Sequence, residues 1–230
     1  GAHGTFKLEG DSDLEEFFAV KPPEIPCILE VFLEGVIQSF DGLVDREGTI
    51  VFRTAHEYGK DVMTTVNLDE DIHYWSLRDI PADLEDYGRK VVAAFDIRES
   101  FFHIEFFRSP KGRLTAMEMN ARPPGGLTTD MFNYANDFDC YRAWAEVVVR
   151  GTTSVPAERP YHACYVGRKL RKDYLNGHED ILARFGPAIL THTAIDSVFR
   201  QAIGDYAYMV RGKTMADVQP MVDFIHEVRS

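Results

Sequence analysis

The stretch that decides the fold covers residues 101–126 and reads Phe101-Phe102-His103-Ile104-Glu105-Phe106-Phe107-Arg108-Ser109-Pro110-Lys111-Gly112-Arg113-Leu114-Thr115-Ala116-Met117-Glu118-Met119-Asn120-Ala121-Arg122-Pro123-Pro124-Gly125-Gly126. Its two halves, Phe101 to Arg108 and Arg113 to Asn120, have the composition of strands. Between them, Ser at the first position, Pro at the second and Gly at the fourth fit a type I turn. The stretch therefore predicts a β-hairpin.

The hairpin places polar side chains on one face. If Ser109 pairs with Gly112, His103 lies opposite Glu118 and Glu105 lies opposite Ala116. Since side chains alternate along a strand, the polar residues then share one face and the apolar residues share the other. A bulge at the turn would change this parity. The expected polar face holds His103, Glu105, Glu118 and Asn120, and the expected apolar face holds Phe102, Ile104, Phe106, Met117 and Met119.

This polar face has the chemistry of a magnesium site. Two carboxylates on neighbouring strands repel each other unless a positive charge lies between them. Mg²⁺ binds a few carboxylate or amide oxygens and keeps phosphate and water in the rest of its shell. Glu105, Glu118 and Asn120 supply such oxygens. The other interpretation is a solvated charged face. His103 fits a substrate contact or a partner of a metal ligand, but the pattern favours an ordinary packed histidine.

The loop after the hairpin can hold an anion. Arg122 follows the hairpin by two residues, and its guanidinium can bind phosphoryl or carboxylate oxygens in two places. Gly125 and Gly126 allow the backbone to approach an anion closely. Taken alone, this segment also fits a plain loop that leads into a helix.

The remaining chain predicts an α+β architecture, because strand-like runs are mixed with helical ones. The first helix should begin at a capping box formed by Ser12 and Glu15 and end near Ala19. A long helix should end before Gly151, and the last should begin at Thr214, with Asp217 three residues on. A further helix is expected from Asp83 to Phe95, and the long helix that ends before Gly151 is expected from Asp130 to Arg150. The expected strands are Cys27 to Phe32, Val36 to Val44, Thr49 to Ala55, Tyr161 to Lys169, Ala188 to Ile195 and Tyr206 to Val210.

The composition and net charge exclude several classes of function and partner. The 230 residues are 45% hydrophobic and 27% charged, with a formal net charge of −12. That charge disfavours nucleic acid as a partner. No apolar run reaches the roughly 20 residues of a spanning helix, so no membrane partner is expected. Three scattered cysteines and the absence of a signal peptide favour a cytoplasmic location, and the start at glycine suggests a fragment of a larger protein.

Together these residues resemble the ATP-grasp superfamily, in particular its carboxylate–amine ligases. The resemblance rests on His103-x-Glu105 and on the run from Glu118 to Gly126. It implies that Glu105, Glu118 and Asn120 hold Mg²⁺, which Mn²⁺ can replace, against the phosphates of ATP. It also implies that Arg122 is catalytic and contacts the transferring phosphoryl group or the acceptor substrate.

Other segments are similar to the same family. The segment from Ile28 to Gly35 resembles the hinge between two ATP-clasping lobes, which implies that Glu30, Val31 and Leu33 face the adenine. Residues 1–7 resemble the end of the glycine-rich loop over the phosphates, so Gly4 is expected to bind nucleotide. The family's ribose-binding carboxylate is replaced by Ile37, with Glu34 or Gln38 as substitutes, and its two phosphate-binding lysines lie upstream of this sequence.

The resemblance implies an ATP-grasp fold that is incomplete at the N-terminus. Residues 1–33 would be part of the small lobe and the hinge, residues 34–155 the large lobe with the metal site, and residues 156–230 a small C-terminal subdomain. The implied activity forms an acyl phosphate from a small-molecule carboxylate and joins it to an amine, in an enzyme compatible with a homodimer. The alternatives are a non-catalytic or regulatory ATP-binding module and an interaction domain without a ligand.

Overall fold

The computed structural model describes residues 6–21, 23–59 and 70–229. It contains helices that pack on an antiparallel sheet, which is an α+β architecture. In chain order the elements are α1 (Asp11–Val20), β1 (Val36–Val44), β2 (Ile50–Tyr58), β3 (His73–Ser76), α3 (Ala82–Ala94), β4 (Phe101–Arg108), β5 (Leu114–Asn120), α4 (Thr128–Asn136), α5 (Cys140–Arg150), β6 (His162–Arg168), α6 (His178–Phe185), the 3₁₀ turn η1 (Gly186–Ala188), β7 (Ile189–Ala194), α7 (Arg200–Ile203), β8 (Tyr206–Gly212) and α8 (Met215–His226).

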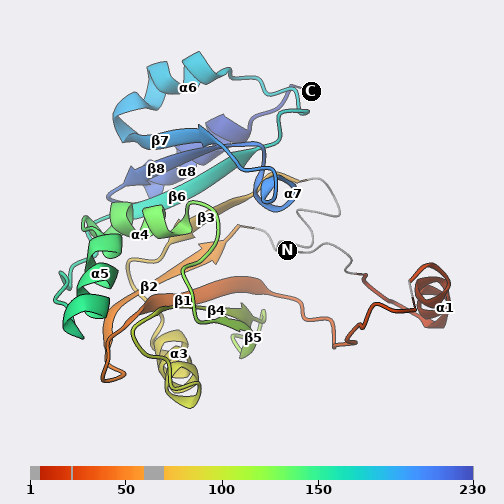
Figure 1. Cartoon of the computed structure of the whole chain (residues 1–230). Helices are drawn as coiled ribbons and strands as arrows, with labels where there is room; N and C mark the ends of the chain where they lie inside the picture. The colour runs from red at the N-terminus through yellow and green to blue at the C-terminus, as the bar shows by residue number, and fades with distance from the viewer. Residues whose placement is uncertain (1–5, 22, 60–69, 230) are drawn as a thin grey trace.

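One eight-stranded sheet runs through the molecule in the order β5-β4-β1-β2-β3-β6-β8-β7 (Figure 1). Its neighbouring strands are all antiparallel. The short strand β3, which lies in a stretch where no strand was expected, pairs with both β2 and β6. The sheet is therefore continuous across the predicted boundary near residue 155, and the division into three domains stays a prediction.

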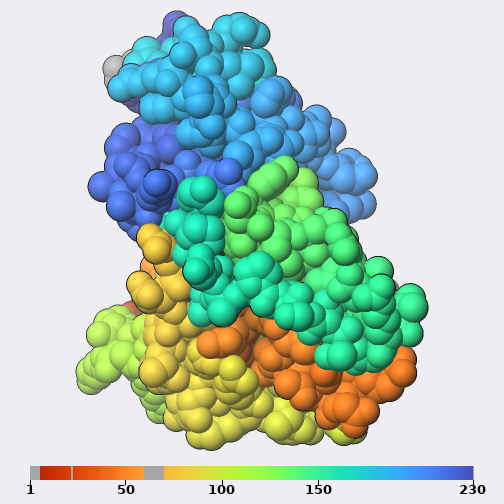
Figure 2. Space-filling model, turned by 90° about the vertical axis from the view of Figure 1, so that its left-hand side faces the viewer, coloured from red at the N-terminus to blue at the C-terminus, as the bar shows by residue number. Residues whose placement is uncertain are grey.

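Helices cover both faces of the sheet. On one face, α4 and α5 pack through Met131, Phe132 and Val147 onto inward residues of the central strands. On the other, α3 packs near β1 and β4, and α6 and α8 pack on the C-terminal strands. In Figure 2, α4 and α5 lie between the C-terminal third at one end and the β1–β2 hairpin with α3 at the other.

The expected long helix from Asp130 to Arg150 is wrong, because the chain breaks it into α4 and α5. Asp137 has a φ of 53° and ends α4 in the left-handed conformation. Asp139 then caps α5 by accepting from the Arg142 backbone N–H (3.0 Å). Asn133 Oδ1 accepts from the Cys140 N–H (2.8 Å) and holds the corner. Local side-chain bonds to the backbone at this point outweigh the continuous helical pattern.

Two expectations near the N-terminus are also wrong. Ser12 does not cap the first helix, since α1 begins after Gly10 without a side-chain cap. The segment from Cys27 to Phe32 is not a strand, and its Ile28, Leu29 and Val31 are 77–83% exposed. A strand needs a neighbour for its backbone hydrogen bonds, and this segment and α1 extend away from the sheet (Figure 1).

The other expected elements are confirmed to within a few residues. The capping box at the start of α8 is formed, because Thr214 and Asp217 bond each other's backbone N–H groups (3.3 and 2.9 Å). Gly151 ends α5 with a φ of 89°. No helix in the part of the chain that the structure describes is long and apolar enough to cross a membrane.

Candidate functional site

The β4–β5 hairpin contains two irregularities that cancel. Ser109 N–H donates to the carbonyl of Arg113 (2.9 Å), so the strands close on Arg113 and not on Gly112 as expected. Gly112 provides the extra residue, with a φ of 83°. A second shift between Glu105 and Phe106 restores the original parity. The expected pairing is therefore wrong in register, whereas the expected shared face is correct.

In the observed register Glu105 lies directly opposite Glu118, and His103 lies directly opposite Asn120. All four side chains share the face that carries α4 and α5. Phe102, Ile104, Phe106 and Met119 pack on the other face, as expected. Met117 is the exception: the second irregularity leaves it without a residue opposite, and it is exposed.

The oxygen atoms on this face fit a hard cation. Glu105 is mostly buried on an inner strand, and Glu118 is exposed on the edge strand β5. Asn120 Nδ2 donates to Glu118 Oε1 (3.0 Å), which holds the amide beside the carboxylate. Carboxylate and amide oxygens are the ligands that Mg²⁺ takes in proteins. In the described residues no group of three or more His, Cys, Asp or Glu is placed to hold a metal ion, and the magnesium site at Glu105, Glu118 and Asn120 stays a prediction.

Behind these oxygens lies a buried network that the sequence did not predict. His103 Nδ1 bonds Asp41 Oδ1 (2.6 Å), and His103 Nε2 lies 3.4 Å from Glu105 Oε1. Asp41 Oδ2 accepts from Ser39 Oγ and lies 3.0 Å from His56 Nδ1. The signal for this network was present in the sequence, as Ser39 and Asp41 alternate within a strand whose other residues are mostly apolar.

The network shifts the acidity of its members. Burial would raise the pKa of Asp41, but the imidazoles of His56 and His103 together outweigh burial and hold that pKa well below its ordinary value. Burial lowers the pKa of His103, while the Asp41 and Glu105 carboxylates raise it to about 10. Burial raises the pKa of Glu105, yet His103 brings it below its ordinary value. Glu105 is therefore a carboxylate at neutral pH.

The loop after β5 places Arg122 at the end of this face. Arg122 Nη1 donates to the Pro123 carbonyl (2.9 Å), and the side chain is exposed. Asp130, in the first turn of α4, accepts from the Tyr141 hydroxyl (3.1 Å). Gly126 has a φ of 62°, and a Cβ there would lie 2.8 Å from Ile203 Cδ1. The glycines thus let the loop pack against α7 from the C-terminal third of the chain.

The structure does not bring the expected adenine contacts to the carboxylates. Glu30 and Val31 are exposed and Leu33 is half-buried, in a segment without regular structure. Gly4 lies outside the described residues. Ile37, at the position of the expected ribose contact, is buried in the core. The adenine slot therefore stays a prediction, because its residues do not enclose a slot among the described residues.

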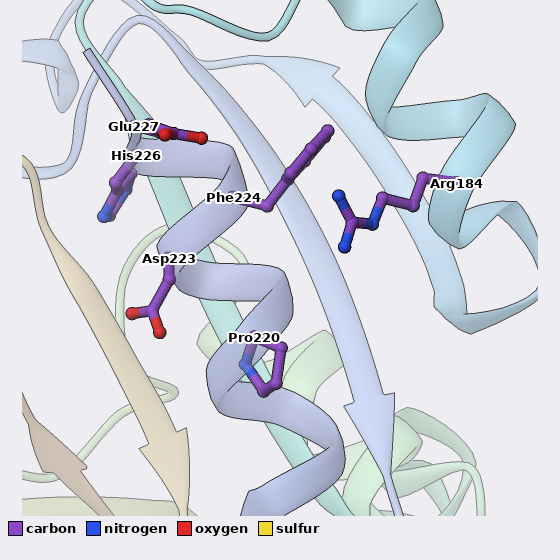
Figure 3. A pocket seen from close by; sticks show the side chains of 6 residues that line it. All are labelled: Arg184, Pro220, Asp223, Phe224, His226 and Glu227. Carbon is purple, nitrogen blue, oxygen red and sulfur yellow. The ribbon is translucent and has the colours of Figure 1, made fainter.

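A hollow elsewhere on the molecule is not part of this site. It is lined by Arg184 of α6, by Pro220, Asp223, Phe224 and His226 of α8, and by Glu227 directly after α8 (Figure 3). These helices cover the face of the sheet opposite to Glu105 and Glu118. None of the sequence-predicted site residues lines this hollow.

The sequence matches a known domain family. Residues 19–130 match the ATP-grasp domain. This range contains the expected hinge, Asp41, His103 and the whole β4–β5 hairpin with Arg122. No curated protein matches the sequence.

Solved structures of low sequence identity share the fold. An L-amino acid ligase from Bacillus licheniformis is 11% identical with a TM-score of 0.63, and the match covers 83% of this chain and 52% of that one. N5-carboxyaminoimidazole synthetase from Staphylococcus aureus is 16% identical with a TM-score of 0.68, covering 95% and 57%. The biotin carboxylase domain of 2-oxoglutarate carboxylase from Hydrogenobacter thermophilus, solved with MgADP and bicarbonate, is 15% identical with a TM-score of 0.55, covering 86% and 47%. The chain thus spans about half the length of these proteins.

Proposed function

Because the chain contains an ATP-grasp domain, we propose that it is the metal- and phosphate-binding part of an ATP-dependent ligase that joins a carboxylate to an amine. The observation that supports this proposal is the pairing of Glu105 with Glu118, beside Asn120, on one sheet face. Arg122 follows Asn120 by two residues and lies in the loop directly after the same strand. The fold likeness supports nucleotide chemistry, and the choice of carboxylate and amine as substrates rests on the motif of the hairpin.

Glu105, Glu118 and Asn120 would hold Mg²⁺, or Mn²⁺ in its place. Bound there, the metal would neutralise phosphate charge and orient the phosphates of ATP. Two carboxylates directly opposite each other repel, and this repulsion is relieved when a cation lies between them. The mostly buried carboxylate of Glu105 and the exposed one of Glu118 together match the mixed shell of Mg²⁺, in which protein oxygens share places with phosphate and water.

The proposed reaction has two steps. A carboxylate oxygen of the first substrate attacks the γ-phosphorus of ATP, the bond to the bridging oxygen breaks, and ADP leaves. The amine nitrogen of the second substrate then attacks the acyl carbon, inorganic phosphate leaves, and the amine loses a proton as the amide forms. In phosphoryl transfer the protein contributes mainly positioning and charge stabilisation.

Arg122 is the proposed catalytic residue. Its guanidinium extends from the loop at the end of β5 and has one N–H bonded to the neighbouring Pro123 carbonyl. The remaining donors can bind two oxygens of a phosphoryl or carboxylate group. A group in this position would stabilise the charge that develops on the transferred phosphoryl oxygens.

A non-catalytic ATP-binding module is the second candidate. The span of the chain favours it, since the chain corresponds to only about half the length of the solved ligase and synthetase with the same fold. In this case the chain would bind the nucleotide with magnesium and turn over nothing.

Binding and turnover separate the two candidates. A non-hydrolysable ATP analogue is titrated into the chain with and without Mg²⁺ by calorimetry, and ADP release is then measured with panels of carboxylates and amines. Magnesium-dependent binding together with substrate-dependent ADP release supports the ligase. Binding without ADP release supports the module, and no magnesium-dependent binding refutes both.

A further inference from the structure

We propose that Asp41 and His103 are positioning residues that fix the carboxylate of Glu105 for the cation, an inference that rests on the proposed function and deepens it. Asp41 lies on β1 and His103 lies on β4. Neither residue belongs to the proposed metal ligands.

A series of contacts leads from Asp41 in the core through His103 to Glu105 in the proposed metal site. Asp41 Oδ1 bonds His103 Nδ1 (2.6 Å), and the other ring nitrogen of His103 lies 3.4 Å from Glu105 Oε1. The Tyr58 hydroxyl donates to the same oxygen (3.1 Å). Both contacts therefore hold Oε1, and in the described part of the chain Oε2 is left for a cation.

The Asp41 carboxylate, at the buried end of this series of contacts, cannot move easily. Asp41 is completely buried, and its second oxygen is held by Ser39 Oγ and His56 Nδ1. The rings of His56 and His103 are parallel within 7° at a centroid distance of 5.9 Å. A buried carboxylate with both oxygens bonded fixes the orientation of the imidazole attached to it.

The backbone register supports the same geometry. Asp41 lies directly opposite His103 in the β1–β4 pair, and Ser39 lies directly opposite both Glu105 and His56. All of these residues lie on the inner strands β4, β1 and β2, which hydrogen-bond to strands on both sides. Sites supported by strands and by a second layer of hydrogen bonds hold their ligands more precisely than sites on loops.

A buried network of this kind also stabilises the sheet, so the experiment needs a readout that does not depend on stability. The variants are Asp41→Asn, His103→Gln and Tyr58→Phe, with Asp45→Asn as the matched control. Asp45 is also a buried carboxylate of the β1–β2 hairpin, but it accepts from Thr49 N–H (2.8 Å) and Thr152 Oγ1 (3.0 Å) at the far end of β1. Its loss should lower the melting temperature without affecting Glu105.

The first measurement is the affinity for an ATP analogue by calorimetry, with Mn²⁺ and without metal. We expect Asp41→Asn and His103→Gln to weaken the manganese-dependent binding by about 10- to 100-fold, the usual effect of losing an outer-layer partner of a metal ligand, while metal-free binding and the Asp45→Asn control stay unchanged. Tyr58→Phe should have a smaller effect in the same direction, because His103 still holds Oε1. Affinities within twofold of the wild type in both main variants would overturn the proposal.

The second measurement is a crystal structure of His103→Gln without ligands. We expect the Glu105 carboxylate to leave its wild-type rotamer or to adopt several, and an unchanged Glu105 rotamer would overturn the proposal even if binding were lost. A wild-type chain that binds no manganese–nucleotide would refute the proposed function, and the crystal structure would still decide whether His103 orients Glu105. If His103→Gln does not fold, this measurement uses Asp41→Asn, which removes the charged partner of the His103 ring; the same movement of Glu105 is expected, and an unchanged rotamer overturns the proposal.

Discussion

Replacing Glu118 by glutamine should stabilise the chain without metal and destabilise it, relative to the wild type, with magnesium and nucleotide. Glu118 lies directly opposite Glu105, and like charges in that position cost up to about 1 kcal/mol. His103 already offsets part of the Glu105 charge, so the relief should be about 0.3 kcal/mol, or roughly 1 °C in the melting temperature. Glutamine keeps an oxygen that can accept from Asn120, so the local hydrogen bond is retained.

Adding magnesium and the ATP analogue should reverse the order of stability of the wild type and Glu118→Gln. At a ligand concentration of 100 times its Kd, the wild type gains about 2.7 kcal/mol from binding, which raises the melting temperature by roughly 5 to 10 °C. A variant whose Kd is raised on the order of 100-fold gains only about 0.4 kcal/mol under the same conditions. The two melting curves should therefore cross when magnesium and the ATP analogue are added.

The assay is a thermal melt of both proteins with and without magnesium and a non-hydrolysable ATP analogue. Glu47→Gln, in the exposed turn between β1 and β2, is the control for a lost surface charge and should follow the wild type in every condition. A merely solvated charged face predicts the small gain in the absence of ligand and no loss in its presence. An equal ligand-induced rise in Glu118→Gln and the wild type would refute the assignment of Glu118 as a metal ligand.

Three further changes test the mechanism, the acid response and the core. Arg122→Lys should reduce turnover of the complete enzyme by about 100- to 1,000-fold with little change in ATP binding, as measured by steady-state kinetics and calorimetry. Burial lowers the pKa of His226 from 6.5 to about 4, so between these pH values the unfolded chain binds a proton at this residue and the folded chain does not. The free energy of unfolding should therefore fall by about 3 kcal/mol between pH 6.5 and pH 4, and His226→Gln should flatten this pH dependence in urea titrations. A Cβ at Gly88 would overlap the ring of Phe40. Gly88→Ala should therefore lower the free energy of unfolding, measured by chemical denaturation, by about 1 to 3 kcal/mol, because this overlap outweighs the higher helix propensity of alanine.

Each of these three predictions can be contradicted by its own measurement. Normal turnover in Arg122→Lys removes that residue from the mechanism. A urea slope in His226→Gln that matches the wild type assigns the acid response to other groups. For Gly88→Ala the control is Lys90→Ala on the exposed side of the same helix, and an equal or smaller cost at Gly88 would show that α3 can shift away from the sheet.

Local patterns were sufficient for much of the candidate site. Strand composition and the Ser-Pro-Lys-Gly turn predicted the hairpin, and the period of two predicted the shared face of Glu105, Glu118 and Asn120. The capping residues Thr214 and Asp217 and the terminating Gly151 were readable in the same way. In each of these cases the deciding interactions lie within a few residues along the chain.

Interactions between distant segments could not be read from such patterns. The exact register of β5 depends on a bulge in the middle of the strand, where packing against β4 outweighs regular pairing. Asp41 meets His103 only because β1 and β4 are neighbours in the sheet, although 62 residues separate them. The strand expected at Cys27 to Phe32 has the right composition but no partner among the described strands. A β-strand and a buried ion pair both need a second segment, and the position of that segment is decided by the packing of the whole chain.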